Sequence, residues 1–215
     1  MQITSHDMDI TLHALYIVGI IAEGMTGAIA AGRKKMDLFG VVTIALITAL
    51  GGGTIRNILL NVYPLTWVDT PIYIVVVTAA ALIALPLVNV VIRLRRLFLI
   101  LDALGLITFA YLGAVIGYSV THSIIIATIM AVVTGVSGGV IRDILCNDIP
   151  LVFRSELYAI VAFLIGLIQG VLMEYWHNTV YATILILCFG FVLRLIALNK
   201  KINLPLIDYK HKDFD

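Results

Sequence analysis

The stretch Thr48-Ala-Leu-Gly-Gly-Gly-Thr-Ile-Arg-Asn57 interrupts a long apolar run with three adjacent glycines and an arginine. A second stretch, Thr134-Gly-Val-Ser-Gly-Gly-Val-Ile-Arg-Asp143, follows 86 residues later and aligns with the first without a gap. Beyond the two stretches, Asn61 corresponds to Asn147 in the same register. Two copies of one unusual feature indicate that the chain is internally duplicated.

The composition places the chain in a membrane. Of its 215 residues, 61% are hydrophobic and only 13% are charged, whereas soluble domains usually carry about 25% charged residues. A spanning helix needs roughly 18 or more mainly apolar residues. Seven stretches approach or exceed that length: 10–31, 38–62, 71–92, 97–118, 123–147, 156–174 and 179–198. We therefore expect an all-α, polytopic membrane protein with seven transmembrane helices.

The basic residues predict how the helices are oriented. Eleven of the 14 Lys and Arg residues lie in the first, third and fifth connections and in the C-terminal tail: Arg33, Lys34, Lys35, Arg93, Arg95, Arg96, Arg154, Lys200, Lys201, Lys210 and Lys212. Cytoplasmic connections carry an excess of Lys and Arg. We expect the odd connections and the C-terminus to be cytoplasmic and the N-terminus to lie outside the cell (inner or plasma) membrane. Arg93, Arg95 and Arg96 are foremost a topology signal and secondarily a candidate site for anionic lipid headgroups.

The duplication predicts a single transmembrane domain built from two repeats. Repeat 1 is expected at 9–92, repeat 2 at 95–174, a seventh helix at 178–198 and a cytoplasmic tail at 199–215. Because each repeat holds three spans, the second must enter the membrane from the opposite side, so the repeats are inverted. In transporters built this way, discontinuous helices meet near the membrane midplane and form the substrate site.

The glycine stretches predict that helices 2 and 5 are broken. A glycine in a helix costs about 1 kcal/mol relative to alanine, and backbone groups freed by a break must face protein or water. The candidate ion path comprises Gly51, Gly52, Gly53, Arg56, Asn57, Ser137, Gly138, Gly139, Arg142 and Asp143, with Glu23 from the first helix. The alternative is that these glycines serve close helix packing, as small residues four apart commonly do in membranes.

The two arginines have two interpretations as well. Facing lipid, each would cost roughly 2.5–3.5 kcal/mol, so Arg56 and Arg142 must face the protein interior, a partner or water. They serve either a structural role, such as an internal salt bridge or a capped helix end, or they line a pore. Asp143, Glu23 and Asp102 are possible partners, although the closeness of Asp102 to the basic third connection favours a surface salt bridge for it.

The paired motifs, within two three-helix repeats and a seventh helix, resemble the trimeric intracellular cation channels in their bacterial and archaeal branch. The residues that carry the resemblance are Gly51-Gly52-Gly53-Thr54-Ile55-Arg56-Asn57 and Ser137-Gly138-Gly139-Val140-Ile141-Arg142-Asp143. The resemblance implies a homotrimer in which each protomer holds a potassium-permeable pore bounded by kinked helices 2 and 5. The first motif ends in Asn57 where the second has Asp143, so the two halves of the pore should differ in charge.

We expect a monovalent cation channel, and the residues leave two other classes open. Related bacterial sequences are also labelled as glycine transporters, so a secondary transporter of a small zwitterion such as glycine is the first alternative; a membrane scaffold is the second. The residues do not decide charge selectivity, because two arginines and helix N-termini favour anions while Asp143, Glu23 and carbonyl ends favour cations. No pattern predicts a catalytic site, a metal set, a cofactor or a nucleic-acid surface, so an enzyme is not expected.

Overall fold

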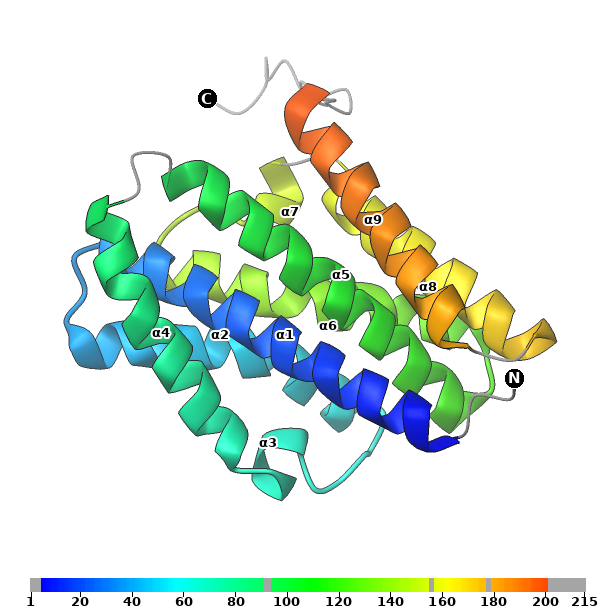
Figure 1. The fold of residues 1–215 in the computed structure, drawn as a ribbon. Coiled ribbons are helices and arrows are strands. Elements are labelled where there is room, and N and C mark those ends of the chain that lie inside the picture. The colour runs from blue at the N-terminus through cyan, green and yellow to red at the C-terminus, as the bar shows by residue number, and fades with distance from the viewer. Residues whose placement is uncertain (1–4, 91–93, 155–156, 177–178, 201–215) are drawn as a thin grey trace, which may run out of the picture.

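The computed structural model describes residues 5–90, 94–154, 157–176 and 179–200, and every regular element in these ranges is a helix. The helices in the described ranges are α1 (Ser5–Arg33), α2 (Leu38–Leu59), α3 (Thr66–Asp69), α4 (Ile72–Val90), α5 (Leu94–Thr121), α6 (Ile124–Leu145), α7 (Leu151–Arg154), α8 (Tyr158–Tyr175) and α9 (Val180–Lys200) (Figure 1). The predicted all-α class is confirmed. The predicted tail beyond residue 200 lies outside the described residues.

Six helices in the described ranges are long and apolar enough to cross a membrane. The spans are Met8–Arg33, Leu38–Leu59, Arg95–Thr121, Ile124–Leu145, Tyr158–Tyr175 and Val180–Lys200. The third predicted span corresponds to α4, which contributes a shorter apolar stretch at Ile72–Pro86. Large apolar side chains point outward from these helices, including Phe39, Ile125 and Leu185, which are 70% or more exposed. Such a surface suits lipid, so the chain is a polytopic membrane protein.

The duplication seen in the sequence extends to the backbone. Helices α2 and α6 are both 22 residues long and begin 86 positions apart. Each is capped at its N-terminus by the residue before it. The side chain of Asp37 accepts a hydrogen bond from the backbone N–H of Gly40, and the side chain of Ser123 accepts one from the backbone N–H of Ile126. The chain leaves both helices through an asparagine with positive φ, 54° at Asn61 and 52° at Asn147. Two copies of the sequence therefore adopt the same local structure.

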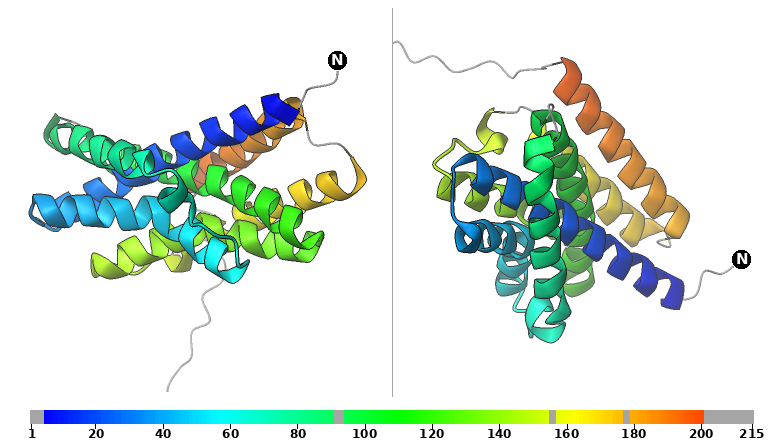
Figure 2. Two further views of the ribbon diagram at one scale, coloured as in Figure 1. Left: turned by 90° about the horizontal axis from the view of Figure 1, so that it is seen from below. Right: turned by 60° about the vertical axis from the view of Figure 1, so that its left-hand side comes forward.

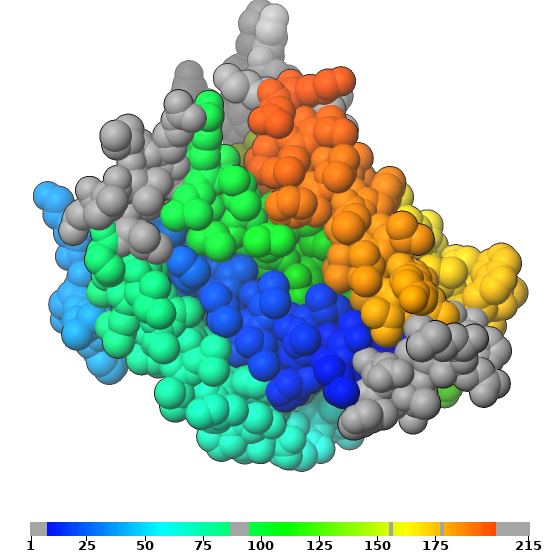
Figure 3. All heavy atoms as spheres, in the orientation of Figure 1, coloured from blue at the N-terminus to red at the C-terminus, as the bar shows by residue number. Residues whose placement is uncertain are grey.

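Helices α1, α2, α5 and α6 form the centre of the bundle. Helix α1 packs against α5 and α2, and α2 packs against α6. Helix α4 covers α1 and α2 on one flank, and α8 and α9 cover α5 on the opposite flank (Figures 1 and 2). The face shown in Figure 3 is formed mainly by α1, α4, α5 and α9. Helices α1 and α5 are the most buried of the four, whereas α2 and α6 also present apolar side chains such as Phe39 and Ile125 on the surface.

The ends of the helices are joined by polar contacts on both sides of the bundle. At one end, Lys34 Nζ lies 2.9 Å from Asp148 Oδ1, which links the α1–α2 connection to the α6–α7 connection. At the other end, the hydroxyl of Tyr118 donates to Glu174 Oε2 at 2.6 Å and links α5 to α8. Helices α1 and α5, which begin the two halves, lie side by side and run in opposite directions (Figure 1).

Candidate functional site

The predicted break in helices 2 and 5 is wrong. Helix α2 runs without interruption through Gly51, Gly52 and Gly53, and α6 does so through Gly138 and Gly139. Between its first and last turns, an unbroken helix pairs every backbone N–H with a backbone C=O of its own, which matters where water is scarce. The glycines are used for the small volume that they occupy rather than for the flexibility of their backbone.

One glycine from each motif sits where α2 and α6 cross. A Cβ atom added to Gly52 would overlap the carbonyl oxygen of Thr134, and one added to Gly138 would overlap the carbonyl oxygen of Thr48. The contact is reciprocal, because Thr134 corresponds to Thr48 in the duplicated register. The packing interpretation is therefore confirmed for Gly52 and Gly138, where any side chain would push the two backbones apart.

The other motif positions play different parts. A Cβ on Gly51 would meet only Ile141 Cδ1, at 3.4 Å, and Ser137, its counterpart, donates its hydroxyl to the carbonyl of Val133. Gly53 and Gly139 each precede an arginine by three residues, and a Cβ there would lie 3.7 Å and 3.5 Å from the Nη2 atom of that arginine. These are ordinary van der Waals distances, so each of these two glycines lies beside a guanidinium group without being required for it.

Arg142 lies at the centre of a buried ionic cluster. Its Nε donates to Asp143 Oδ1 at 2.8 Å, and its Nη1 lies 3.0 Å from Asp102 Oδ1 and 3.7 Å from Glu23 Oε2. Nη1 also donates to the hydroxyl of Thr26 at 3.0 Å. The guanidinium is 0% exposed, and its flat face covers the Phe98 ring at 4.7 Å. One cation is thus surrounded by three carboxyl groups from three helices.

Arg56 occupies the matching position in the first half but has different surroundings. Its Nε and Nη2 donate to Asn57 Oδ1 at 3.0 Å and 2.7 Å, and its Nη1 has no hydrogen-bond partner within the described part of the chain. No ion pair joins Arg56 to a carboxylate among the residues that the structure describes. Asn57 in turn donates to the hydroxyl of Thr66 at 3.2 Å. The two halves therefore differ in charge, as the contrast between Asn57 and Asp143 predicted.

A second difference between the halves concerns Glu23. Gly105 gives Glu23 its space, because a Cβ there would overlap the Glu23 carboxyl group. In the duplicated register Glu23 corresponds to Phe109 and Gly105 to Gly19. A Cβ on Gly19 would indeed lie 3.1 Å from the Phe109 ring. The same packing motif thus holds a carboxyl group on one side of the protein and an apolar ring on the other.

The surface salt bridge expected for Asp102 is wrong. Asp102 is 0% exposed and binds Arg142, one of the partners considered for it from the sequence. Helix α5 turns it inward, because α5 packs against both α1 and α6. Of the basic cluster, Arg95 and Arg96 are exposed, and Arg93 lies outside the described residues.

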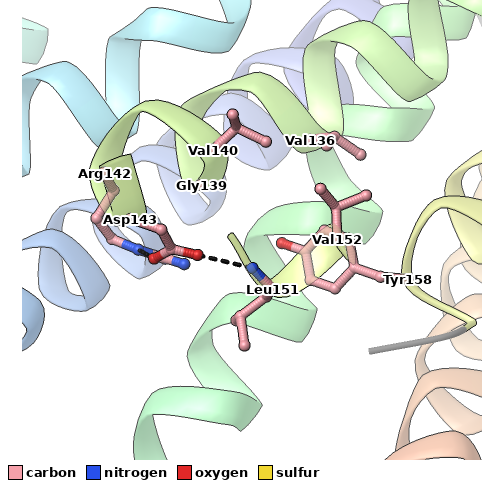
Figure 4. Close-up of a pocket in the computed structure, with 8 residues that line it drawn as sticks. All are labelled: Val136, Gly139, Val140, Arg142, Asp143, Leu151, Val152 and Tyr158. Atoms are coloured by element: carbon pink, nitrogen blue, oxygen red, sulfur yellow. Dashed lines mark hydrogen bonds and ion pairs between the residues drawn. The ribbon is translucent and has the colours of Figure 1, made fainter. Parts of the chain in front are cut away.

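A narrow pocket beside Arg142 opens between α6, α7 and α8 (Figure 4). It is lined by Val136, Gly139, Val140, Arg142, Asp143, Leu151, Val152 and Tyr158. At its edge, the backbone N–H of Leu151 donates to Asp143 Oδ2 at 2.9 Å, which fixes the carboxylate between the arginine and the start of α7.

Sequence reasoning missed three side chains in or beside this site. The hydroxyl of Tyr158 lies against the backbone of α6, 3.4 Å from where a Cβ on Gly139 would be. Arg194 of α9 is 1% exposed and stacks over the Tyr158 ring at 4.5 Å. Thr26 joins Glu23 to Arg142. A lone arginine within the apolar stretch 179–198 was a signal for Arg194, whereas no sequence pattern marks Thr26 or Tyr158. Within the described ranges, no group of three or more His, Cys, Asp or Glu side chains could hold a metal ion.

Comparison with known proteins places the chain in a family. The UPF0126 inner membrane protein YadS of Escherichia coli (strain K12) is 37% identical over 170 residues, which cover 79% of this chain and 78% of that protein. A structure reported as the structural basis for conductance through TRIC cation channels has a TM-score of 0.83 and 34% identity, covering 93% of this chain and 98% of that chain. This chain belongs to the trimeric intracellular cation (TRIC) channel family.

Further matches agree with membership of the TRIC family. The orthologue from Rhodobacter sphaeroides, solved as a TRIC trimeric intracellular cation channel, has a TM-score of 0.82 and 31% identity, covering 89% of this chain and 99% of that chain. A family model described as "Glycine transporter" matches residues 13–89 and again residues 99–174. The two matched segments coincide with the two halves of the duplication.

Proposed function

We propose that this TRIC-family protein is a monovalent cation channel, permeable to potassium, with one path through each protomer. The observation that carries the proposal is the charge of the cluster around Arg142. Three carboxyl groups, from Glu23, Asp102 and Asp143, surround a single guanidinium. The two motif arginines alone would favour anions, but the carboxyl groups outnumber the arginine that they surround. An interior with excess negative charge attracts cations and repels anions.

The proposed path starts at the pocket between α6, α7 and α8, where Asp143 lies at the lining. It continues past the carboxyl cluster and along the contact between α2 and α6 to Arg56 and Asn57 in the other half. Gly52 and Gly138 hold the two helices in direct backbone contact. We propose that this contact is the gate. The channel would open when α2 and α6 separate and admit water and ions, and neither helix would need to unwind at its glycines.

The assembly and orientation form part of the same proposal. The antiparallel course of α1 and α5 (Figure 1) and the matched caps of α2 and α6 support inverted repeats at 9–92 and 95–174. The distribution of Lys and Arg supports a cytoplasmic C-terminus and an outer N-terminus. A homotrimer is proposed from the family, and the exposed Arg95 and Arg96 are proposed to contact anionic lipid headgroups.

A second candidate function is secondary transport of a small zwitterion such as glycine. The observation that favours it is the family model's description, "Glycine transporter", matched over both halves. A transporter would need a site for the carboxylate and the amine of its substrate. Arg56, whose Nη1 has no hydrogen-bond partner, supplies a donor for the carboxylate, and the cluster around Arg142 supplies acceptors for the amine.

Reconstitution in planar bilayers separates the two functions. A potassium channel should give unitary currents. Their reversal potential should change with the potassium gradient and should not depend on the chloride gradient. Proteoliposomes should not accumulate labelled glycine under a sodium or proton gradient. Saturable, gradient-driven glycine uptake without unitary currents would contradict the channel and support the transporter.

A further inference from the structure

Glu23 is bound differently from the other two carboxyl groups around Arg142. Arg142 reaches Asp143 Oδ1 at 2.8 Å and Asp102 Oδ1 at 3.0 Å, which are distances of direct hydrogen bonds. Its distance to Glu23 Oε2 is 3.7 Å, which is too long for one. Nε and Nη1 of Arg142 donate to the two aspartates, and Nη1 also donates to Thr26, so Glu23 receives no direct hydrogen bond from the cation.

The hydroxyl of Thr26 lies between Glu23 and the arginine. It is 2.9 Å from the Glu23 carbonyl oxygen, 3.0 Å from Glu23 Oε2 and 3.0 Å from Arg142 Nη1. A hydroxyl has one hydrogen to donate. Arg142 is itself a donor, so the Thr26 hydrogen must serve two oxygens of Glu23 at once. A proton on Oε2 would supply the missing hydrogen, with Thr26 as its acceptor.

Other groups around Glu23 do not balance its charge. Glu23 is 2% exposed and its neighbour Asp102 is 0% exposed, and Asp102 Oδ2 has no hydrogen-bond partner among the described residues. The charged and titratable groups that face the cluster are Asp102 from α5, Arg142 and Asp143 from α6, Tyr158 from α8, and Arg194 from α9, which acts on Asp102 and Tyr158. On the side that faces α4, the residue that follows Glu23, Gly24, lies against the apolar Val77. A buried carboxylate that no cation binds through a direct hydrogen bond is unfavourable, and protonation removes its charge.

We propose that Glu23 is a proton-binding site inside the membrane-spanning bundle. With its carboxyl group protonated, the cluster of Arg142, Asp102 and Asp143 has a net charge of one negative unit. When Glu23 releases its proton to water, the net charge becomes two negative units. The second half has no equivalent group in the duplicated register, because Phe109 occupies the position that corresponds to Glu23, so the duplicated register carries this site once.

The consequence for ion flow rests on the proposed channel function, whereas the protonation itself does not. A second negative charge beside the path raises the local concentration of cations and repels anions. Potassium flux through the channel should therefore increase as the pH rises and Glu23 loses its proton. Protons and potassium ions would compete for the same negative charge.

Infrared spectroscopy of the full chain in lipid tests the proton directly. The sequence has three glutamates, Glu23, Glu156 and Glu174. Wild-type protein should show the C=O band of a protonated carboxylic acid near neutral pH. The band should shift when the glutamates are labelled with ¹³C at the carboxyl carbon, and it should fade as the pH is raised to about 9. The labelled wild type needs no substitution, so the test holds even if a variant fails to fold.

Two variants assign the band to its residue. Glu23→Gln should abolish it, whereas Glu174→Gln, which alters an exposed glutamate bound to Tyr118, should leave it unchanged. Absence of the band from the wild type between about pH 5 and pH 9 would overturn the proposal. Its persistence in Glu23→Gln would overturn it as well.

Potassium flux measured across the same pH range tests the consequence. Wild type and Glu174→Gln should gain flux several-fold from the acidic to the alkaline end, and Glu23→Gln should stay at the low, acidic level throughout. Equal pH dependence in wild type and Glu23→Gln would refute the role of Glu23 in permeation. Wild-type protein that shows the infrared band but passes no potassium at any pH would refute the proposed channel while upholding the proton site.

Discussion

Replacing Gly52 with alanine should destabilise the protein, although alanine is the better helix former. The added Cβ would overlap the carbonyl oxygen of Thr134 on α6, and a backbone atom cannot rotate away as a side chain can. Overpacking of this kind destabilises a protein by about 3 kcal/mol at the upper end of its range. The higher helix propensity of alanine stabilises the folded state by about 1 kcal/mol. We expect a net loss of about 2 kcal/mol, which lowers the melting temperature by about 4–8 °C for a chain of this size.

The adjacent glycines provide matched controls for Gly52→Ala. A Cβ on Gly51 would meet only the flexible end of Ile141 at 3.4 Å, and one on Gly53 would lie 3.7 Å from Arg56 Nη2. Gly51→Ala should therefore be neutral or stabilising by up to about 1 kcal/mol. Thermal unfolding in one detergent, followed by circular dichroism, measures both variants. Equal melting temperatures for Gly52→Ala and Gly51→Ala would refute the close crossing of α2 and α6.

Three further substitutions test the cluster and its surroundings. Arg142→Ala would leave three buried carboxyl groups without their cation and should destabilise by about 3–5 kcal/mol, measured by the same unfolding assay; a loss below about 1 kcal/mol would show that the cluster is open to water. Gly105→Ala should displace the Glu23 carboxyl group, and a change in the pH dependence of potassium flux would reveal the displacement. Lys34→Ala breaks an ion pair with Asp148 whose side chains are 35% and 49% exposed. Its effect should stay below about 1 kcal/mol, and a larger loss would mean that this contact holds the bundle together.

The helical periodicity and the duplication could be found from the sequence because they are repeated, local signals. The register that joins Thr48 to Thr134 also aligns the N-caps Asp37 and Ser123 and the left-handed residue Asn61 with Asn147. The expectation of broken helices failed because adjacent glycines are compatible with both unwinding and close packing. Only the position of the second helix distinguishes these two uses.

The arrangement of the site depended on contacts that the sequence does not contain. The sequence placed Asp102 near the basic third connection, yet the rotation of α5 turns it toward α6 and Arg142. Thr26 could not be recognised, since threonines in membrane helices commonly bond to their own backbone, as Thr48 does to Ile44. The three carboxyl groups around Arg142 come from three different helices, so their excess over the arginine could not be predicted before the packing of those helices was known.

The central claim is that cations pass the carboxyl cluster inside one protomer, and exchanging the residues that follow the two arginines tests it most directly. Asp143→Asn gives the second motif the residue of the first, and Asn57→Asp does the reverse. Single-channel potassium conductance should fall in Asp143→Asn, stay equal or rise in Asn57→Asp, and remain unchanged in Arg154→Ala, which alters an exposed residue of α7. Equal conductance in Asp143→Asn, Arg154→Ala and wild type would contradict a path past Asp143.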